Sequence, residues 1–357
     1  MMTRRAEIHR ISMSGPSDVS GIESLIASGL IKAGQIRAIL GKTEGNGCVN
    51  DFTRGYATQS LRAMLSCHLS GGEIDRLPMV MSGGTEGGLS PHWILFCETE
   101  SGTDSGPALA FASAITRDLK PSEIGRQAQA ELTCDAVLDA MKQADISRPE
   151  DVHFVQIKCP LLTSERVAEA DGDVSTSSML RSMGLSRGAS ALGVALALGE
   201  IDQIPQNSIG NDHDLWSSRA SCSSGIELMA CEIVVIGQSA SWSGPLRAAH
   251  GVMTDAIDAT SVANLLAQVT PSRIIQGGPE RMLAVLAKAE ASSNGSIRNS
   301  RHTMNEDSDL SATRHARAFV GGLLAGMVGH TELFVSGGAE HQGPDGGGPV
   351  AIIYSTT

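Results

Sequence analysis

Lysine, arginine and serine recur three times in the same order along this 357-residue chain, each time in a similar local sequence. The lysine follows a short apolar run, as in AILGKTE, FVQIKCP and AVLAKAE, and the serine opens a turn of small residues with a glutamate four positions later. Between them, an arginine follows a hydroxyl residue and precedes a stretch that could begin a helix. The three sets are Lys42, Arg54 and Ser82; Lys158, Arg187 and Ser223; and Lys288, Arg314 and Ser336. Any one set could arise by chance, whereas three ordered sets indicate a triplicated chain.

These residue types can act together in nucleophilic chemistry. A serine in a small-residue turn exposes its hydroxyl beside free backbone N–H groups, which suits either a nucleophile with an oxyanion site or an anion-binding turn. A lysine can remove the serine's proton only when it is neutral, so its pKa must fall by about three units, which corresponds to roughly 4 kcal/mol. A second cation about 4 Å away would supply that much. We therefore expect the lysines and arginines to share one cavity, which would favour a flat ring rich in carbonyl groups.

The elements that must position these residues are those of an α/β fold. Strand-like runs such as FVQI, EIVVIG, ELFVS and VAIIYS alternate with helical stretches such as QAELTCDAVLDAMKQA and SALGVALALGE. The sequence predicts three similar units, each a sheet with helices on one face, closing around a pseudo-threefold axis. Their expected limits are residues 1–104, 112–249 and 253–357.

Composition narrows the function classes. Hydrophobic residues make up 41% of the chain and charged residues 18%, as in a packed soluble protein. A formal net charge of -12 argues against nucleic acid as a partner. No apolar run is long enough to cross a membrane and no leader pattern is present, so a cytoplasmic protein is expected. The seven cysteines include no C-x-x-C pair and are expected to be reduced thiols; a thiol nucleophile at Cys159 or Cys222 is disfavoured because neither cysteine recurs in the other units.

Metal chemistry has one candidate place. The ten histidines are scattered and form no H-E-x-x-H motif, so a catalytic zinc site is not expected. The segment EHQGPDGGGP is different, because a loop rich in Gly and Pro turns its carbonyl groups outward. Together with the carboxylate of Glu290 it could hold Mg²⁺ or Ca²⁺, although the same composition also describes a plain loop.

Several longer blocks resemble one known family. GKTEGNGCVNDFTRGYAT, VMSGGTEGG, HFVQIKCPLLT, SRGASALG, HGVMTDAIDA, VLAKAEAS and SGGAEHQGPDGGGP occur in the order found in the cyclic amide hydrolases that comprise cyanuric acid hydrolases and barbiturases. The resemblance runs from about residue 8 to residue 353. It implies the Toblerone fold, in which three similar α/β units surround a pseudo-threefold axis with one central active site, and commonly a homotetramer.

The resemblance also implies an activity. Cyanuric acid hydrolases of s-triazine degradation open the ring of cyanuric acid with water to give carboxybiuret, which loses carbon dioxide to become biuret, and they need no organic cofactor. A barbiturase acting on a pyrimidine ring is the nearest alternative, and the block GKTEGNGCVNDFTRGYAT favours cyanuric acid. A non-catalytic protein that binds a flat heterocycle in the same cavity is a further alternative.

Residue roles follow from the family by position. Ser223 would be the nucleophile and Lys158 its base, forming an acyl-enzyme that water cleaves, while Lys42 and Lys288 would help to keep Lys158 neutral. Ser221 and Ser224 flank the nucleophile closely, and the other two Ser/Lys pairs remain open as the working pair. The substrate-binding set would be Arg54, Ser82, Gly83, Arg187, Ser224, Arg314, Ser336 and Gly337. The family's structural metal site falls on Glu290, Ala339, Gln342, Gly343, Pro344 and Gly347.

Overall fold

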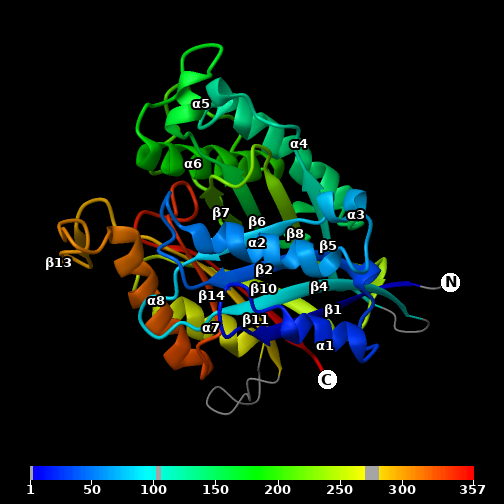
Figure 1. Cartoon of the computed structure of the whole chain (residues 1–357). Coiled ribbons are helices and arrows are strands. Elements are labelled where there is room, and N and C mark those ends of the chain that lie inside the picture. The colour runs from blue at the N-terminus through cyan, green and yellow to red at the C-terminus, as the bar shows by residue number, and fades with distance from the viewer. Residues whose placement is uncertain (1–2, 102–105, 270–280) are drawn as a thin grey trace.

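The chain folds as a mixed α/β protein with three main β-sheets, seen in a computed structural model (Figure 1). The structure describes residues 3–101, 106–269 and 281–357. The predicted unit limits at residues 1 and 104 lie outside the described residues.

All three sheets share one topology. A strand that carries one of the predicted serines lies at the edge, parallel to the strand that carries the lysine, and two antiparallel strands complete the sheet. In this order the first sheet contains β3 (Met79–Gly83), β2 (Ile36–Thr43), β4 (His92–Ser101) and β1 (Thr3–Ser12), with β9 (Trp242–Ser243) added beside β1. The second contains β7 (Ala220–Gly225), β6 (Val152–Pro160), β8 (Glu232–Ser239) and β5 (Ala108–Ile115). The third contains β14 (Phe334–Gly337), β11 (Met282–Ala289), β15 (Gly348–Ser355) and β10 (Leu246–Met253), and β12 (Ser296–Ile297) pairs with β13 (Ser300–Arg301) apart from it.

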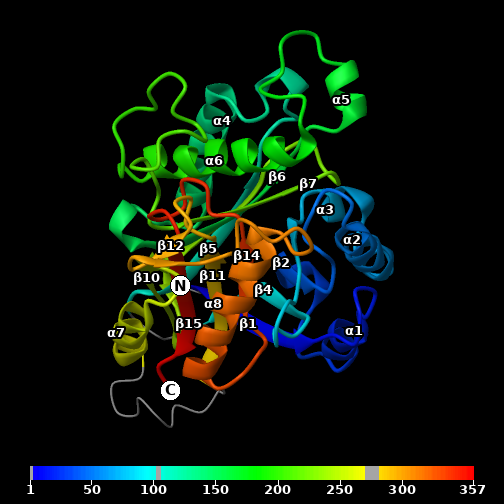
Figure 2. The same cartoon turned by 90° about the vertical axis from the view of Figure 1, so that its left-hand side faces the viewer.

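Helices cover the outer side of the sheets, so the inner faces are left to meet one another (Figure 2). The first unit has α1 (Ser20–Ala27), α2 (Phe52–Leu65), α3 (Gly71–Asp75) and the 3-10 turn η1 (Ala33–Gln35). The second has α4 (Gln127–Gln143), α5 (Ser164–Ala168), α6 (Met179–Ala197) and the 3-10 turns η2 (Pro121–Glu123) and η3 (Pro149–Asp151). The third has α7 (Ala259–Val269) and α8 (Ala312–Val328).

Strand alternation explains why the lysines point inward. In β2, Leu40 packs in the central core shared by all three sheets, whereas Ile39 packs in a separate outer core beneath α1 and α2. In β11, Leu286 and Val285 divide between the central core and the core beneath α7 and α8 in the same way. Because side chains two residues apart share a face, each lysine that follows these inward leucines by two positions also faces the centre.

The repeated topology agrees with the predicted fold of three similar α/β units. The predicted unit limits remain a prediction, and two strands cross them. β5 begins at Ala108, ahead of 112, and β10 pairs with β15 of the third sheet along its whole length although the second unit was predicted to reach 249. No helix in the described part of the chain is long and apolar enough to span a lipid bilayer.

A histidine pair joins the second and third sheets. His153 Nδ1 lies 2.9 Å from His250 Nδ1, and Gln238 Nε2 lies 2.8 Å from His153 Nε2. The pKa of both histidines is lowered to about 4, first by burial and also by Arg219; His153 adds to the lowering at His250, and Asp151 partly opposes it at His153. Both rings are therefore neutral at pH 7 in the folded protein.

We expect this pair to make the protein less stable in mild acid. The two histidines bind protons near pH 6.5 in the unfolded chain and only near pH 4 in the folded chain. Their contribution to the free energy of unfolding is therefore fully present above pH 6.5 and is lost as the pH drops toward 4. At pH 5 the loss is about 2 kcal/mol for each ring. Urea unfolding of the wild type and of His250→Gln at pH 7.5 and 5.0 measures it. The variant should lose less stability on acidification, whereas the exposed His213→Gln should behave as wild type; equal losses in all three proteins would contradict the prediction.

Candidate active site

The three lysines lie directly opposite the three serines on neighbouring parallel strands. The paired residues are Lys42 with Ser82, Lys158 with Ser223, and Lys288 with Ser336. All three lysines are at most 1% exposed. Each predicted pair is thus formed within one sheet, at the carboxyl ends of its two parallel strands.

The three serine hydroxyls converge from the three sheets. Ser336 Oγ lies 2.7 Å from Ser82 Oγ and 3.3 Å from Ser223 Oγ. Residues separated by more than 100 positions in the sequence are therefore in hydrogen-bonding contact at one point. A ligand placed there would meet an equivalent hydroxyl from every unit.

Each lysine also binds the neighbouring unit. Its ammonium nitrogen donates to the carbonyl oxygen of the residue just before the neighbour's serine. The three contacts are Lys42 Nζ to Val335 O at 2.5 Å, Lys158 Nζ to Met81 O at 2.8 Å, and Lys288 Nζ to Cys222 O at 2.8 Å. These contacts close a ring of three units around the serines.

Burial is the first cause of the lysines' altered basicity. It lowers the pKa of Lys288 to about 7, with Arg187 acting in the same direction, and it lowers the pKa of Lys42 well below its usual value. At Lys158 burial again lowers the pKa, Glu227 opposes this, and Arg54 adds to it. The sequence predicts that Lys42 and Lys288 lower the pKa of Lys158. In the structure, burial and Arg54 are the main causes of the lowering.

An arginine from each unit faces a glutamate of the next. These glutamates stand four residues after the serines, a spacing that is visible in the sequence but does not show which residues the glutamates contact. Arg187 binds Glu340 through Nε and Nη2 at 2.7 and 2.6 Å, and Arg317 binds Glu86 through the same two atoms at 2.8 Å each. The third pair is looser, with Arg54 Nε 3.8 Å from Glu227 Oε1.

The arginine of the third unit differs from the predicted one. Arg314 has a side chain 33% exposed and contacts Glu86 from outside, whereas Arg317 is 3% exposed and lines the cavity. The segment ATRHARA contains both arginines, and the T-R match to the other units selects Arg314. In the structure Arg317, almost one helical turn later, lines the cavity, because that position of α8 faces the centre.

The cavity gathers most of the predicted binding residues. Its lining consists of Gly47, Arg54, Ser82, Gly83, Met183, Arg187, Ser223, Ser224, Arg317 and Gly337. Ser336 reaches it through its contact with Ser82. Gly47, Met183 and Arg317 were not predicted. At Gly47 the φ angle is +69°, and a Cβ would lie 2.7 Å from Arg317 Nη1, so only glycine lets the arginine fill this place.

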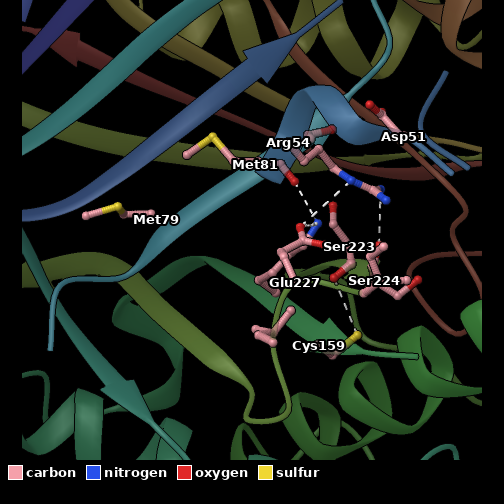
Figure 3. A network of polar contacts seen from close by, with 12 residues as sticks. Asp51, Arg54, Met79, Met81, Cys159, Ser223, Ser224 and Glu227 are labelled. Atoms are coloured by element: carbon pink, nitrogen blue, oxygen red, sulfur yellow. Dashed lines mark hydrogen bonds and ion pairs between the residues drawn. The ribbon is translucent and has the colours of Figure 1, made fainter. Parts of the chain in front are cut away.

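Figure 3 shows how the first unit reaches Ser223: Arg54 extends from α2 toward Ser223, Ser224 and Glu227. Arg54 Nη1 donates to Ser224 O at 3.3 Å, and Cys159 Sγ donates to Ser223 O at 3.4 Å. Burial raises the pKa of the Cys159 thiol, so it stays protonated at neutral pH and is a poor nucleophile. Burial has the same effect on the pKa of the Cys222 thiol.

The predicted metal loop lies behind the serine strand of the second unit. Gln342 Oε1 accepts a hydrogen bond from Cys222 N at 2.6 Å, and the Gln342 amide donates to Gly338 O and Glu340 O. Both oxygens of Glu290 accept backbone N–H groups, from Ala291 and Ala339. Within the described ranges no cluster of three or more His, Cys, Asp or Glu side chains could hold a metal ion, so a cation here would depend on carbonyl oxygens.

Comparisons with known proteins agree over the whole length of the chain. The sequence pattern of the family described as amidohydrolase ring-opening protein matches residues 7–355. The chain is 56% identical to a cyanuric acid amidohydrolase of Azorhizobium caulinodans and 54% identical to one of Rhizobium johnstonii, with 99% of each chain covered in both cases. The crystal structure of the cyanuric acid hydrolase from A. caulinodans superposes with a TM-score of 0.94, covering 99% of both chains. A second cyanuric acid hydrolase structure, 47% identical, gives the same TM-score and covers 99% of this chain and 100% of its own.

Proposed function

This chain belongs to the family of ring-opening amidohydrolases, and from that premise we propose that it hydrolyses a ring amide bond of cyanuric acid. The product would be carboxybiuret, which loses carbon dioxide to give biuret. The observation that carries the proposal is the convergence of three serine hydroxyls, with Ser336 Oγ within 3.3 Å of the other two, in a cavity lined by three buried arginines. Cyanuric acid has the matching threefold arrangement of carbonyl and N–H groups. Full-length identity to cyanuric acid amidohydrolases supports the same substrate.

We propose that Ser223 is the nucleophile and Lys158 its base. Neutral Lys158 takes the hydroxyl proton as Ser223 Oγ bonds to a ring carbonyl carbon. The proton then passes to the ring nitrogen as the C–N bond breaks, leaving an acyl-enzyme. Water attacks this ester, Lys158 takes the proton of that water, and Ser223 is released with its own proton restored. Among the three lysines, and within the described residues, only Lys158 lies within 4 Å of a carboxylate, which supports the choice of the middle pair.

The other residues of the cavity would bind the ring rather than react with it. Arg54, Arg187 and Arg317 present guanidinium groups to the carbonyl groups of the ring, with Arg317 in the place predicted for Arg314. The remaining ring atoms would contact the serine turns, formed by Ser82, Gly83, Ser224, Ser336 and Gly337. Lys42 and Lys288 would fix these turns through the backbone carbonyls that they bind.

Turnover on two rings tests the function. Purified protein is incubated with cyanuric acid and, separately, with barbituric acid, and ring loss and carbon dioxide release are followed. The proposal requires biuret and carbon dioxide from cyanuric acid at a rate well above that on barbituric acid. Faster opening of barbituric acid would make the chain a barbiturase, and tight binding of cyanuric acid with no product would make it a binding protein.

A structural cation at the third unit's loop is also proposed. Burial and Glu340 raise the pKa of Glu290 to about 7, and within the described residues no Lys or Arg forms an ion pair with it. One carboxylate beside carbonyl-rich backbone is a ligand set that Mg²⁺ and Ca²⁺ accept. A Cβ at Gly347 would lie 2.1 Å from Met253 O, so the loop requires glycine there. Glu290 and the carbonyls of Ala339, Gln342, Gly343, Pro344 and Gly347 would hold the ion, which would brace the strand of Ser223 through Gln342.

Removing divalent ions with EDTA is therefore expected to lower the melting temperature by about 5 °C. Adding Mg²⁺ or Ca²⁺ in excess should restore it, and the ion that restores it at the lower concentration is the native one. Glu290→Gln should melt at the lower temperature and respond to neither treatment. A wild-type melting temperature that ignores both EDTA and added ions would rule the site out.

We also propose that the protein forms a homotetramer and is located in the cytoplasm. The family resemblance supports a homotetramer, which light scattering on the purified protein would test. The seven cysteines are all free thiols, which supports the reducing environment of the cytoplasm.

A further inference from the structure

We propose that Glu227 is a positioning residue for the reaction: it holds the Lys158 ammonium that forms when Ser223 gives up its proton, and moves to Arg54 when Lys158 is neutral. This inference rests on the proposed function and on the proposed Ser223–Lys158 pair. It would make the working set a serine, a lysine and a carboxylate.

The three equivalent glutamates do not make equivalent contacts. Glu86 and Glu340 each bind an arginine through two short hydrogen bonds. Glu227 instead places Oε1 2.9 Å from Lys158 Nζ. The middle unit, which holds the proposed nucleophile, is therefore the unit whose carboxylate has turned from arginine to lysine.

Arg54 has one donor that the carboxylate of Glu227 could bind. Its Nη2 donates to Cys48 O at 2.8 Å and its Nη1 to Ser224 O at 3.3 Å, which fixes the guanidinium. Its Nε is buried, has no hydrogen-bond partner and lies 3.8 Å from Glu227 Oε1. In the other two units the corresponding Nε donates to the glutamate. A small side-chain movement would give Glu227 the contact that Glu86 and Glu340 already have.

The charged and titratable groups around Lys158 come from four segments of the chain. Glu227 follows β7, Arg54 extends from α2, Cys159 is the next residue on β6, and Glu232 lies on β8 directly opposite Lys158. Glu232 binds Met79 N at 3.0 Å, and burial raises the pKa of its carboxyl. Arg166 acts on Glu227 from the side of α5.

Glu227 is ionised beside the charged Lys158. Although burial alone would raise its pKa, Lys158 and Arg54 lower it to about 2, and Arg54 stays beside the carboxylate when Lys158 is neutral. The glutamate therefore takes no proton in the cycle. The proton moves from Ser223 Oγ to Lys158 Nζ as the C–O bond forms, and from Lys158 Nζ to the ring nitrogen as the C–N bond breaks. The carboxylate stabilises the ammonium between these steps, as a buried aspartate stabilises an imidazolium in the serine protease triad.

The pH profile of kcat/KM tests this role, with Glu227→Gln as the variant and Glu86→Gln as its matched control. A carboxylate favours the charged form of a neighbouring lysine, so its removal makes Lys158 neutral at lower pH. The acidic limb should move down by about one pH unit in Glu227→Gln, with kcat lowered about 10- to 100-fold and KM little changed. Glu86→Gln should weaken substrate binding and leave the limb in place. Glu227→Asp, which keeps the carboxylate, should return the limb toward its wild-type position.

An unmoved limb in Glu227→Gln, or an equal shift in Glu86→Gln, would overturn the inference. A direct titration separates it from the proposed function. In the Ser223→Ala background, ¹⁵N NMR of the lysine side chains should place the Lys158 midpoint lower when Glu227 is Gln than when it is Glu. That comparison needs no turnover, so absence of hydrolysis would refute the function alone, and equal midpoints would refute the role of Glu227 alone.

Discussion

Replacing Ser223 with alanine is expected to reduce hydrolysis of cyanuric acid by about 10⁴-fold. The hydroxyl oxygen is the atom that bonds to the ring carbonyl, so its removal takes away the proposed nucleophile. Ser223 Oγ lies opposite the buried Lys158 across paired strands, whereas the neighbouring Ser221 is fully buried and does not line the cavity. Turnover at saturating substrate, measured by biuret formation, gives the comparison.

Ser82→Ala and Ser336→Ala are the matched controls, because they remove equivalent hydroxyls from the other two units. Each should lose about 10- to 100-fold in kcat/KM, since a hydrogen bond to the ring is lost while the nucleophile remains. Binding of cyanuric acid to Ser223→Ala, measured by calorimetry, should persist. Full activity of Ser223→Ala, or complete loss in one of the other two variants with Ser223→Ala active, would move the chemistry to another unit.

Replacing Arg317 with methionine is expected to lower kcat/KM by about 10²-fold, mostly through KM. Arg317 lines the cavity and binds both Glu86 and the backbone of Asn46, with Nη2 3.1 Å from Asn46 O. Its loss removes one of three guanidinium groups that would clamp the ring and leaves Glu86 with Arg314 alone.

Arg314→Met is the matched control, since it changes the same residue type on the same helix and contacts the same glutamate. Arg314→Met should lower kcat/KM by less than about fivefold, because the Arg314 side chain is only partly buried and is not among the residues that line the cavity. A larger loss in Arg314→Met than in Arg317→Met would restore the assignment made from the sequence. Circular dichroism of both variants would confirm that each is folded before the rates are compared.

The part of the site that lies on strands could be predicted from the sequence. Lysine and serine each follow an apolar run at a fixed distance, and the two-residue repeat of a strand then determines which face they share, as Leu40 and Lys42 illustrate. Three repeats of that pattern were enough to predict three similar units and their common centre. The family resemblance added the substrate and the choice of Ser223.

The part of the site that depends on helices and on contacts between units could not be predicted in this way. In ATRHARA two arginines stand three residues apart, and only the packing of α8 decides that Arg317 faces the cavity. The glutamates recur in the sequence, yet their partners belong to other units, so no local pattern shows that Glu340 meets Arg187. The same holds for Lys158, because Arg54, the cation that lowers its pKa, comes from a segment about 100 residues away.

Each of the three lysines donates a hydrogen bond to the backbone of the adjacent unit, at the residue before that unit's serine. Each third of the active site is therefore assembled from two parts of the polypeptide. Three identical separate subunits could build the same ring, but a mutation would then change all three subunits in the same way. In a single chain each unit can change on its own. The glutamate of one unit can then contact lysine while its two counterparts contact arginine, so that three similar units perform different tasks.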